Sequence, residues 1–429
     1  MPLRTSASAD ASADTVSRAT DYPFAERTRL LESSEVRALF AVASRPEVVS
    51  LAGGMPFVSA LPTELIADSM NRVMHDRGAQ ALQYGSGQGR PELREQILDV
   101  MALEGIRAHA DDIVVTTGSQ HALDLVSRLF LDPGDVVLAE GPSYVTAIVV
   151  FRSYQADVDH VPMDEHGIIP EALTEHIERL KAQGRRIKLL YTIPNFSNPA
   201  GVTLSAQRRE EVLAIARRHD ILVLEDNPYG LLYFDAPTPA ALRSLPDTRD
   251  GVVYLGTFSK TLAPGFRVGW AVAPKPIREK LLLANEAAIL SPSMFTQLII
   301  SEYLATADWK AQIATFRGIY RERRDAMLSA LETHLPGLSW TRPDGGFYVW
   351  LTLPDGINSK DMLPRAVEKL VAYTPGTAFY ANGDGANFIR LAFCYPEPER
   401  VREGIARLAD TISAELELSG VTGTQARAG

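Results

Sequence analysis

The sequence predicts an α/β protein, and two observations lead to that fold class. Short apolar runs alternate with helical patterns between residues 113 and 270. This order is typical of a mostly parallel sheet flanked by helices. After Trp270 the alternation loosens, and the segments 345–350 and 388–393 alternate like strands of a smaller sheet. We therefore expect one large α/β domain and one smaller α/β domain.

Composition narrows the class of protein. A chain of 429 residues can bury a large core and form two or three domains. Its formal charge of -10 argues against a nucleic-acid partner and suits small anionic or zwitterionic ligands in a local basic pocket. The single cysteine, Cys394, excludes an intrachain disulfide and a cysteine-rich metal site. The histidines show no H-E-x-x-H or similar pairing, so we expect no metal.

The chain ends and the longest apolar runs bear on location. No apolar run approaches the roughly 20 residues of a membrane span, so we expect no membrane partner. Residues 1–20 are rich in Ala, Ser, Asp and Thr and lack the apolar core of a secretory signal, which favours a disordered tail. Residues 419–429 are a second polar tail. A cytoplasmic location is the default expectation.

The first expected elements precede the sheet. A short helix is expected over 34–44, and the apolar run 48–51 then leads into Gly53 and Gly54. These glycines indicate either a plain turn or a backbone that must pass close to another group. Helical spacing follows over 61–75 and again from Pro91. The glycine-rich segment between them is not a phosphate loop, because no strand leads in and no G-K-[ST] follows.

The large domain is expected to contain five strands and two intervening helices, with a further apolar strand beginning at Arg267. Ligands bind beyond the carboxyl ends of such strands, where the candidate polar residues lie. After the first strand, the backbone amides of Ser119 and Gln120 can cradle an anion, although a serine helix cap is a common alternative. The strands are expected at 113–116, 136–139, 187–193, 221–225 and 252–255, and the helices at 118–131 and 205–219; after residue 270, long helices are expected at 277–293 and 295–331.

The segment from Tyr254 to Trp270 carries an unusual lysine. Lys260 follows an apolar strand and small hydroxyl residues, so we expect its amine in a walled pocket. A desolvated amine loses its proton more readily and reacts with aldehydes, which is how lysine holds a carbonyl cofactor. Nearby Thr257, Ser259 and Arg267 offer hydroxyl groups and a guanidinium suited to one phosphate.

This segment, S/T-x-S-K followed by a turn and R-x-G, resembles the cofactor-lysine segment of the class I and II aminotransferases, pyridoxal-phosphate enzymes of fold type I. Three further motifs occur in the family's order. P-x-x-x-N-P-x-G lies at 194–201, D-x-x-Y at 226–229 and N-x-I-R-L-x-F at 387–393. The resemblance covers about residues 30 to 415. Thr257 stands where serine is usual, a change that keeps the hydrogen bond.

The resemblance implies a domain plan and an oligomer. It implies a large cofactor domain and a smaller domain built from both chain ends. The implied division is a tail at 1–20, an arm and part of the small domain at 21–60, the large pyridoxal-phosphate domain at 61–305, the small domain at 306–418 and a tail at 419–429. In the family a tyrosine matching Tyr84 reaches the cofactor phosphate of the partner subunit, which implies a homodimer; a packed tyrosine is the alternative.

The resemblance also assigns roles to single residues. Lys260 is the implied catalytic residue, serving as both cofactor anchor and general base. Arg390, alone among apolar strand residues, is implied to grip the substrate α-carboxylate, with a structural ion pair as the alternative. The implied cofactor-binding residues are Ser119, Gln120, Tyr144, Asn198, Asp226, Tyr229, Thr257, Ser259, Lys260, Arg267 and Tyr84, and the implied substrate-binding residues are Arg390, Asn198, Gly53 and Arg37.

The implied activity is transfer of the amino group of an L-amino acid to a 2-oxo acid, with 2-oxoglutarate as the expected acceptor. The S-x-V-R, L-A-G-G-x-P and N-P-A-G motifs are most similar to the 2-aminoadipate and kynurenine aminotransferase branch. A decarboxylase, lyase or oxidase on the same fold is one alternative. A regulator with a DNA-binding module is another, although residues 1–60 carry six Lys/Arg against seven Asp/Glu. The sequence does not identify the donor.

Overall fold

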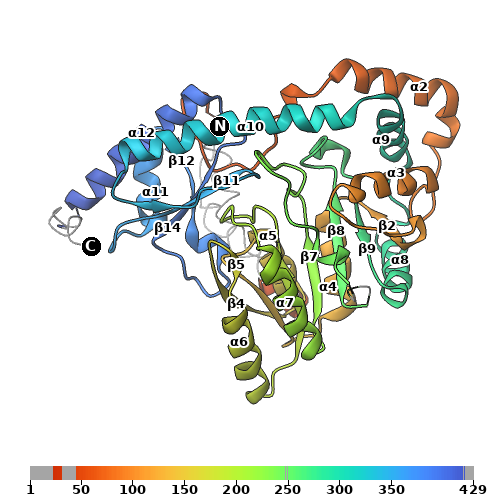
Figure 1. The fold of residues 1–429 in the computed structure, drawn as a ribbon, viewed down its shortest axis with the longest axis horizontal. Helices are drawn as coiled ribbons and strands as arrows, with labels where there is room; N and C mark the ends of the chain where they lie inside the picture. The colour runs from red at the N-terminus through yellow and green to blue at the C-terminus, as the bar shows by residue number, and fades with distance from the viewer. Residues whose placement is uncertain (1–22, 31–44, 247, 249, 419, 421–429) are drawn as a thin grey trace, which may run out of the picture.

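Eight strands form one mixed sheet, drawn in Figure 1. The computed structural model describes residues 23–30, 45–246, 248, 250–418 and 420, so the expected helix at 34–44 and Arg37 lie outside the described residues. The strand order is β2-β9-β8-β7-β6-β3-β4-β5. Neighbours from β8 to β4 are parallel, and the other pairs are antiparallel. The strands are β2 (Ile113–Thr116), β3 (Val136–Gly141), β4 (Asp157–Asp164), β5 (Gly167–Ile168), β6 (Ile187–Thr192), β7 (Leu222–Asp226), β8 (Val252–Thr257) and β9 (Gly269–Val272).

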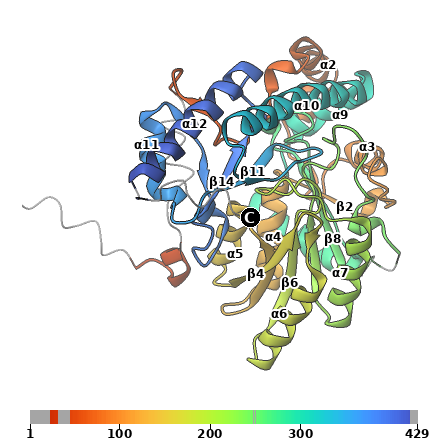
Figure 2. The same cartoon turned by 60° about the vertical axis from the view of Figure 1, so that its left-hand side comes forward.

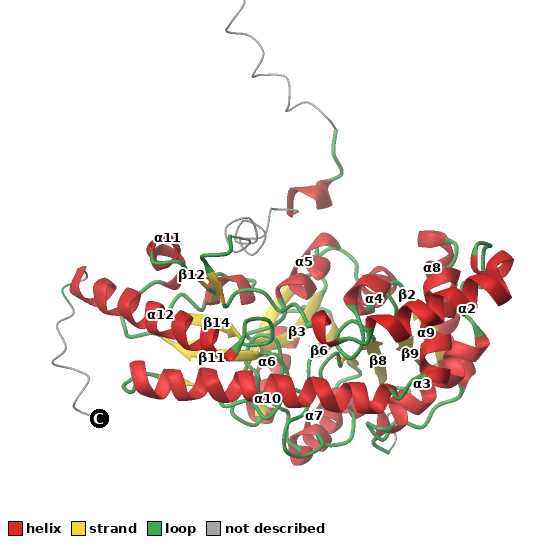
Figure 3. Cartoon of the chain, turned by 90° about the horizontal axis from the view of Figure 1, so that it is seen from above, coloured by secondary structure: helices red, strands yellow, loops and turns green. Residues whose placement is uncertain are grey.

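Helices cover both faces of this sheet because its strands are apolar on both sides. Val137 of β3 belongs to the same apolar cluster as Leu123 of α4, whereas Leu138 belongs to a second cluster with Ile177 of α6. Successive side chains of a strand point to opposite faces, so the two clusters are the two sides of the sheet. Figure 3 shows α4 and α5 on one side and α7 on the other. The helices are α4 (Ser119–Phe130), α5 (Val145–Ser153), α6 (Pro170–Ala182), α7 (Ala206–Arg218) and α8 (Lys275–Ile289).

A smaller sheet lies beside the large one, as the two views in Figures 1 and 2 show. It is antiparallel in the order β10-β11-β14-β13. β1 pairs in parallel with β12, which brings Val49 opposite Val371 and joins the two ends of the chain. The predicted α/β fold class with a smaller second part is confirmed. These strands are β1 (Val49–Ser50), β10 (Ser339–Trp340), β11 (Tyr348–Thr352), β12 (Val371–Ala372), β13 (Thr374–Pro375) and β14 (Phe388–Ala392), and the helices beside them are α11 (Ser359–Glu368) and α12 (Pro398–Leu418).

A long helix, α10 (Trp309–His334), runs from the side of α9 (Met294–Thr306) to the side of α12 (Figure 1). The prediction of one helix over 295–331 is therefore wrong. The break follows from Asp308, whose carboxylate accepts a hydrogen bond from the backbone N–H of Ala311 at 3.0 Å and caps the start of α10.

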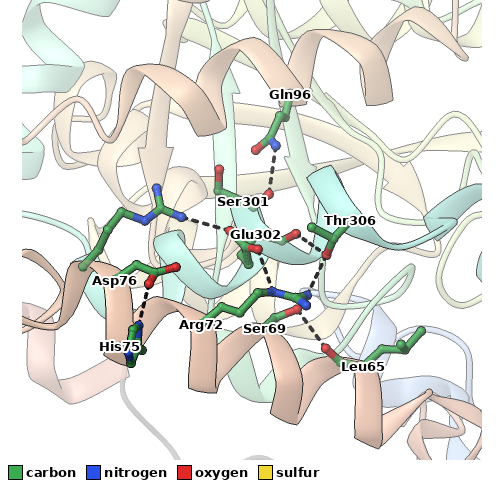
Figure 4. A network of polar contacts seen from close by, with 10 residues as sticks. Leu65, Ser69, Arg72, His75, Asp76, Gln96, Ser301, Glu302 and Thr306 are labelled. Carbon is green, nitrogen blue, oxygen red and sulfur yellow. Dashed lines mark hydrogen bonds and ion pairs between the residues drawn. The ribbon is translucent and has the colours of Figure 1, made fainter.

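Ion pairs and hydrogen bonds hold α2 (Thr63–Ala81) and α3 (Pro91–Ala102) against α9, as Figure 4 shows. Arg72 donates to the carboxylate of Glu302 at 2.9 Å, and Gln96 donates to the backbone oxygen of Ser301 at 2.9 Å. The connection between α2 and α3, which contains Tyr84, is thus fixed at both of its ends.

The remaining regular segments are short 3-10 turns. In the part of the chain that the structure describes, no helix is both long and apolar enough to cross a membrane. The turns are η1 (Glu26–Leu30), η2 (Val58–Ala60), η3 (Ala110–Asp112), η4 (Leu242–Ser244), η5 (Pro264–Phe266) and η6 (Gly376–Phe379).

Candidate active site

The carboxyl ends of four neighbouring parallel strands, β3, β6, β7 and β8, open onto one cavity of about 300 Å³. This is where ligands bind in open α/β sheets. The structure brings eleven of the residues predicted from the sequence together at this cavity. They are Ser119, Gln120, Tyr144, Asn198, Asp226, Tyr229, Thr257, Ser259, Lys260, Arg267 and Arg390.

Lys260 lies just beyond the end of β8 and points into the cavity. Its Nζ donates a hydrogen bond to the backbone oxygen of Gly54 at 3.0 Å and lies 5.6 Å from the ring centre of Phe347. Burial lowers the pKa of the amine from 10.5 to about 8, and the positive charges of Arg390 and Arg267 act in the same direction. A substantial fraction of the amine is therefore neutral near pH 8 and able to act as a nucleophile or base.

Asp226 ends β7 and faces the same cavity. Tyr191 donates a hydrogen bond to its Oδ2 at 2.8 Å, whereas its Oδ1 is buried without a partner among the described residues. Burial raises the pKa of this carboxyl group to about 6, while the Tyr191 hydrogen bond and the Lys260 charge oppose the rise. A buried carboxylate oxygen with no partner calls for a cationic or N–H donor from a ligand.

The backbone around Gly118 and the side chain of Arg267 form a cradle for an anion. Gly118 has φ +84 and precedes α4, and a Cβ there would lie 2.6 Å from Arg267 Nη2. Arg267 also donates to Ser259 Oγ at 3.4 Å, and Ser259 Oγ lies 2.9 Å from Thr257 Oγ1. The start of a helix, two hydroxyl groups and a guanidinium provide the donors that a phosphate group needs.

Arg390 of β14 reaches the cavity from the smaller sheet, opposite the strand ends of the large sheet, and is 4% exposed. Its hydrogen bonds go to neutral oxygens, namely Asn198 Oδ1 at 2.8 Å, the Ala52 backbone oxygen at 2.5 Å and Thr374 Oγ1 at 3.2 Å. Its Nε is buried without a partner among the residues described. A buried guanidinium in neutral surroundings is a strong site for a ligand carboxylate.

Three tyrosines complete the cavity wall. The hydroxyl oxygens of Tyr229 and Tyr348 lie 3.3 Å apart, and the Arg390 guanidinium carbon lies 4.3 Å from the centre of the Tyr348 ring. Burial raises the pKa of all three hydroxyl groups. The pKa of Tyr144 lies above its usual value, that of Tyr229 lies well above 10, and that of Tyr348 is about 12. All three hydroxyl groups are thus kept protonated and can donate hydrogen bonds.

Among the described residues, Gly53 and Tyr84 were predicted for the site but do not line this cavity. Gly53 lies one residue away, and its backbone oxygen is 3.6 Å from Cys394 Sγ, so it is Gly54 that faces Lys260. Tyr84 is 77% exposed, and its predicted role at a second subunit stays a prediction. Arg37 lies outside the described residues.

The sequence did not predict Tyr348 and Tyr191 as site residues, and of the two glycines it indicated, Gly54 rather than Gly53 contacts Lys260. Tyr348 begins β11, and Tyr191 is a strand residue whose hydroxyl reaches Asp226 from the neighbouring strand. A tyrosine among aliphatic residues of a central strand was a signal for Tyr191, since a buried hydroxyl needs a partner. Nothing in the local sequence distinguished Tyr348 from a packed strand residue.

The family model for aminotransferase class I and II matches residues 48–408. The chain belongs to this family. It is 41% identical over 396 residues to aromatic-amino-acid aminotransferase 1 of Thermococcus litoralis, with 92% of this chain and 95% of the relative covered. It is 37% identical over 391 residues to 2-aminoadipate transaminase of Thermus thermophilus, with 90% and 96% covered.

Solved structures agree with this assignment. The crystal structure of Pyrococcus horikoshii kynurenine aminotransferase with PMP has a TM-score of 0.87 and 42% sequence identity, covering 92% of this chain and 97% of that one. The fold is therefore fold type I, and this aminotransferase is a pyridoxal-phosphate enzyme that carries out transamination. The enzyme class and cofactor predicted from the sequence are confirmed.

The cavity of this aminotransferase fits pyridoxal 5′-phosphate. The cradle around Gly118 and Arg267 suits the phosphate group, and the unpartnered Asp226 Oδ1 suits a protonated ring nitrogen. Lys260, with its lowered pKa, suits the aldehyde carbon. In the described part of the chain no cluster of His, Cys, Asp or Glu could hold a metal ion.

Proposed function

We propose that this aminotransferase moves the amino group of several L-amino acids to 2-oxoglutarate by a ping-pong mechanism, using the cavity around Lys260. The observation that carries this proposal is the placement of Lys260 and Arg390 on one cavity. The first provides an amine with a lowered pKa, and the second provides a buried guanidinium bonded to neutral oxygens. An amino acid held by its carboxylate at Arg390 would place its Cα within reach of the Lys260 amine in the same cavity.

Ten residues besides Lys260 would hold the cofactor in this proposal. When bound, its pyridine ring accepts the electron pair left at the substrate Cα after loss of a proton. Asp226 would keep the ring nitrogen protonated, Tyr229 and Asn198 would donate to the ring oxygen, and Tyr144 would stack on the ring. The phosphate would be held by Ser119, Gln120, Thr257, Ser259 and Arg267, with Tyr84 of a second subunit.

Lys260 would have two tasks. Its amine would hold the cofactor aldehyde carbon between reactions and, once freed by the incoming amino acid, would take the proton from the substrate Cα. The pKa of about 8 supports both tasks, since a base works best when its pKa lies near the working pH. The Gly54 backbone oxygen, 3.0 Å from Nζ, would keep the free amine in the cavity.

The donors are proposed from the names of the relatives. The three relatives described above act on aromatic amino acids, 2-aminoadipate and kynurenine, as their names state. We propose donors of the same kind for this chain. Arg390 and Asn198 would bind the α-carboxylate, and the segment at Gly53, with Arg37, would meet the side chain.

A homodimer is proposed from exposed apolar side chains beside the predicted subunit-crossing tyrosine. Leu82 is 74% exposed, Tyr84 77% and Leu290 55%. The backbone N–H of Gly85 bonds Ser291 Oγ at 3.4 Å, so these residues form one region. Contiguous exposed apolar groups mark interaction surfaces. We also propose the domain limits 61–305 and 306–418. They are supported by the two larger sheets, which are built from separate stretches of the chain. A cytoplasmic location stays a prediction.

Two experiments test this proposal. Initial rates are measured with varied 2-aminoadipate, phenylalanine or kynurenine at each of several fixed 2-oxoglutarate concentrations. For each donor, the double-reciprocal lines are expected to be parallel. Carbon dioxide or hydrogen peroxide release without a new amino acid would contradict it. For the dimer, mixing Tyr84→Ala with Lys260→Ala chains is expected to restore activity, because one site of each mixed dimer is intact. No recovery in mixed dimers would place Tyr84 in its own subunit's site or outside the site.

A further inference from the structure

A chain of buried polar side chains lies behind the wall of the cavity that carries Asp226 and Tyr229. It consists of Glu104, Asn227, Asn195 and Arg209, of which none is more than 7% exposed. As far as the chain is described, none of the four lines the cavity. Buried polar groups of this kind are costly unless each is paired, so the network calls for an explanation.

The hydrogen bonds of the network all run the same way, from the guanidinium toward the carboxyl group. Asn227 Nδ2 donates to Glu104 Oε1 at 2.8 Å, Asn195 Nδ2 donates to Asn227 Oδ1 at 3.0 Å, and Arg209 Nη2 donates to Asn195 Oδ1 at 2.5 Å. Each amide donates toward the carboxyl group and accepts from the side of the guanidinium. Hydrogen bonds aligned in this way between a carboxyl group and a guanidinium polarise and strengthen one another.

The network is attached to both loops that carry proposed cofactor residues. Asn227 directly follows Asp226, and its Oδ1 also accepts from the backbone N–H of Gly230 at 3.1 Å, which closes the turn containing Tyr229. Asn195 lies in the loop before Asn198. The hydrogen bond between the two amides therefore joins the loop after β6 to the loop after β7.

Both ends of the network are anchored in rigid structure. Arg209 of α7 donates to the backbone oxygens of Pro194 at 3.1 Å and Leu204 at 2.9 Å, one on each side of the Asn198 loop. Glu104 accepts from the hydroxyl of Tyr254 in β8 at 2.6 Å. A Cβ on Gly230 would lie 1.9 Å from Glu104 Oε1, so the turn is pressed against the carboxyl group.

We propose that Asn195 and Asn227 are positioning residues of this aminotransferase, whose mutual hydrogen bond sets the loop of Asn198 against the loop of Asp226 and Tyr229. The cofactor ring must meet all three side chains at once. Asp226 is held by its pairing with Leu255 at the end of β7, whereas Asn198 and Tyr229 lie on loops outside the named strands. The inference rests on the proposed cofactor roles of these three residues.

A double-mutant cycle tests the pair. Asn195→Ala, Asn227→Ala and the double variant are compared with the wild type by the dissociation constant of pyridoxal phosphate and the visible spectrum of the bound cofactor. Each single change is expected to raise the dissociation constant about tenfold, the effect of losing one buried hydrogen bond. The double variant is expected to add little, because the first change already breaks the link.

Tyr373→Phe is the matched control. Its buried hydroxyl donates to the Ser359 backbone oxygen at 2.7 Å, away from the cavity, so its loss is expected to lower the melting temperature without changing cofactor affinity. If the alanine variants do not fold, Tyr254→Phe removes one of the two donors to Glu104 and is expected to weaken cofactor binding about two- to fivefold.

Three outcomes are distinguishable. Fully additive effects, or a change in cofactor affinity no larger than that of the Tyr373 control, would overturn the positioning role. Asp226→Ala is measured alongside. If that change leaves cofactor affinity untouched, the proposed role of Asp226 fails instead. If it weakens binding strongly while the asparagine variants do not, only the present inference fails.

Discussion

Lys260 donates a hydrogen bond from Nζ to the backbone oxygen of Gly54 at 3.0 Å, although 206 positions separate the two residues. The arm can come this close only because residue 54 has no side chain. A Cβ at Gly54 would lie 1.8 Å from the hydroxyl oxygen of Tyr348. The contact thus joins the beginning of the chain, the large sheet and the smaller sheet at one point of the cavity.

Gly54→Ala is expected to lower kcat about 10- to 100-fold, because either the arm or Tyr348 must move and reacting groups are sensitive to shifts of about 1 Å. Gly318→Ala in α10 is the control. A Cβ there meets nothing within 4 Å, so activity should stay unchanged and the melting temperature should rise slightly. Steady-state kinetics and thermal unfolding of both variants check this, and full activity of Gly54→Ala would refute it.

Arg390→Lys is expected to raise KM for donors and acceptors alike by about 10- to 100-fold, since a lysine cannot make the paired hydrogen bonds of a guanidinium to a carboxylate. Cofactor affinity should stay within about twofold, because the proposed contact of Arg390 is with substrate. An equal loss of cofactor affinity would instead mean that Arg390 mainly holds the loop of Asn198, to which it donates at 2.8 Å.

The affinity for pyridoxal phosphate is expected to fall as the pH falls through about 6. Burial raises the pKa of Asp226 to about 6, so below that pH the free protein carries a neutral carboxyl group there. A neutral group cannot pair with a protonated ring nitrogen, and one linked proton weakens binding at most tenfold per pH unit. Equilibrium dialysis from pH 5 to pH 8 measures this. Asp226→Asn should remove the pH dependence, and an unchanged slope in that variant would assign it to another group.

Glu140→Gln is expected to gain stability relative to the wild type as the pH rises. Glu140 is buried and accepts from Thr192 Oγ1 at 2.6 Å, and burial raises its pKa from 4.5 to about 7. Between these values the folded protein keeps a proton that the unfolded chain releases, so the wild-type free energy of unfolding falls as pH increases. The difference in urea-unfolding free energy should grow from pH 5 to pH 8 by at most about 3 kcal/mol. A constant difference would show that Glu140 does not titrate in this range.

Much of the large sheet could be predicted because its strands are short apolar runs with turn residues after them. Asp226 and Lys260 were placed correctly at one cavity for this reason, since parallel strands end at the same edge. β4 was not predicted, because its sequence Asp157–Asp164 contains three aspartates, a histidine and a proline near the edge of the sheet and shows no apolar run. The break between α9 and α10 depended on one capping residue, Asp308.

The rest of the site depends on contacts between distant residues. Whether Tyr348 faces the cavity is decided by the register of β11, in which Tyr348 lies opposite Ala392 and Trp350 opposite Arg390. The Tyr191 contact with Asp226 spans 35 positions and two strands. No local sequence motif predicts either relationship. Motifs indicated the groups that are proposed to meet the cofactor, but not the side chains that hold those groups in place.

The most direct test of the account is a half-reaction without an oxo acid. The purified holoenzyme is mixed with 2-aminoadipate, phenylalanine or kynurenine, and the visible absorbance and the products are followed before and after 2-oxoglutarate is added. We predict loss of the cofactor's visible band with release of the matching 2-oxo acid, return of the band with formation of glutamate, and neither change in Lys260→Ala. Retention of the band with every donor, or the same conversion in Lys260→Ala, would contradict the role of Lys260 in transamination at this cavity.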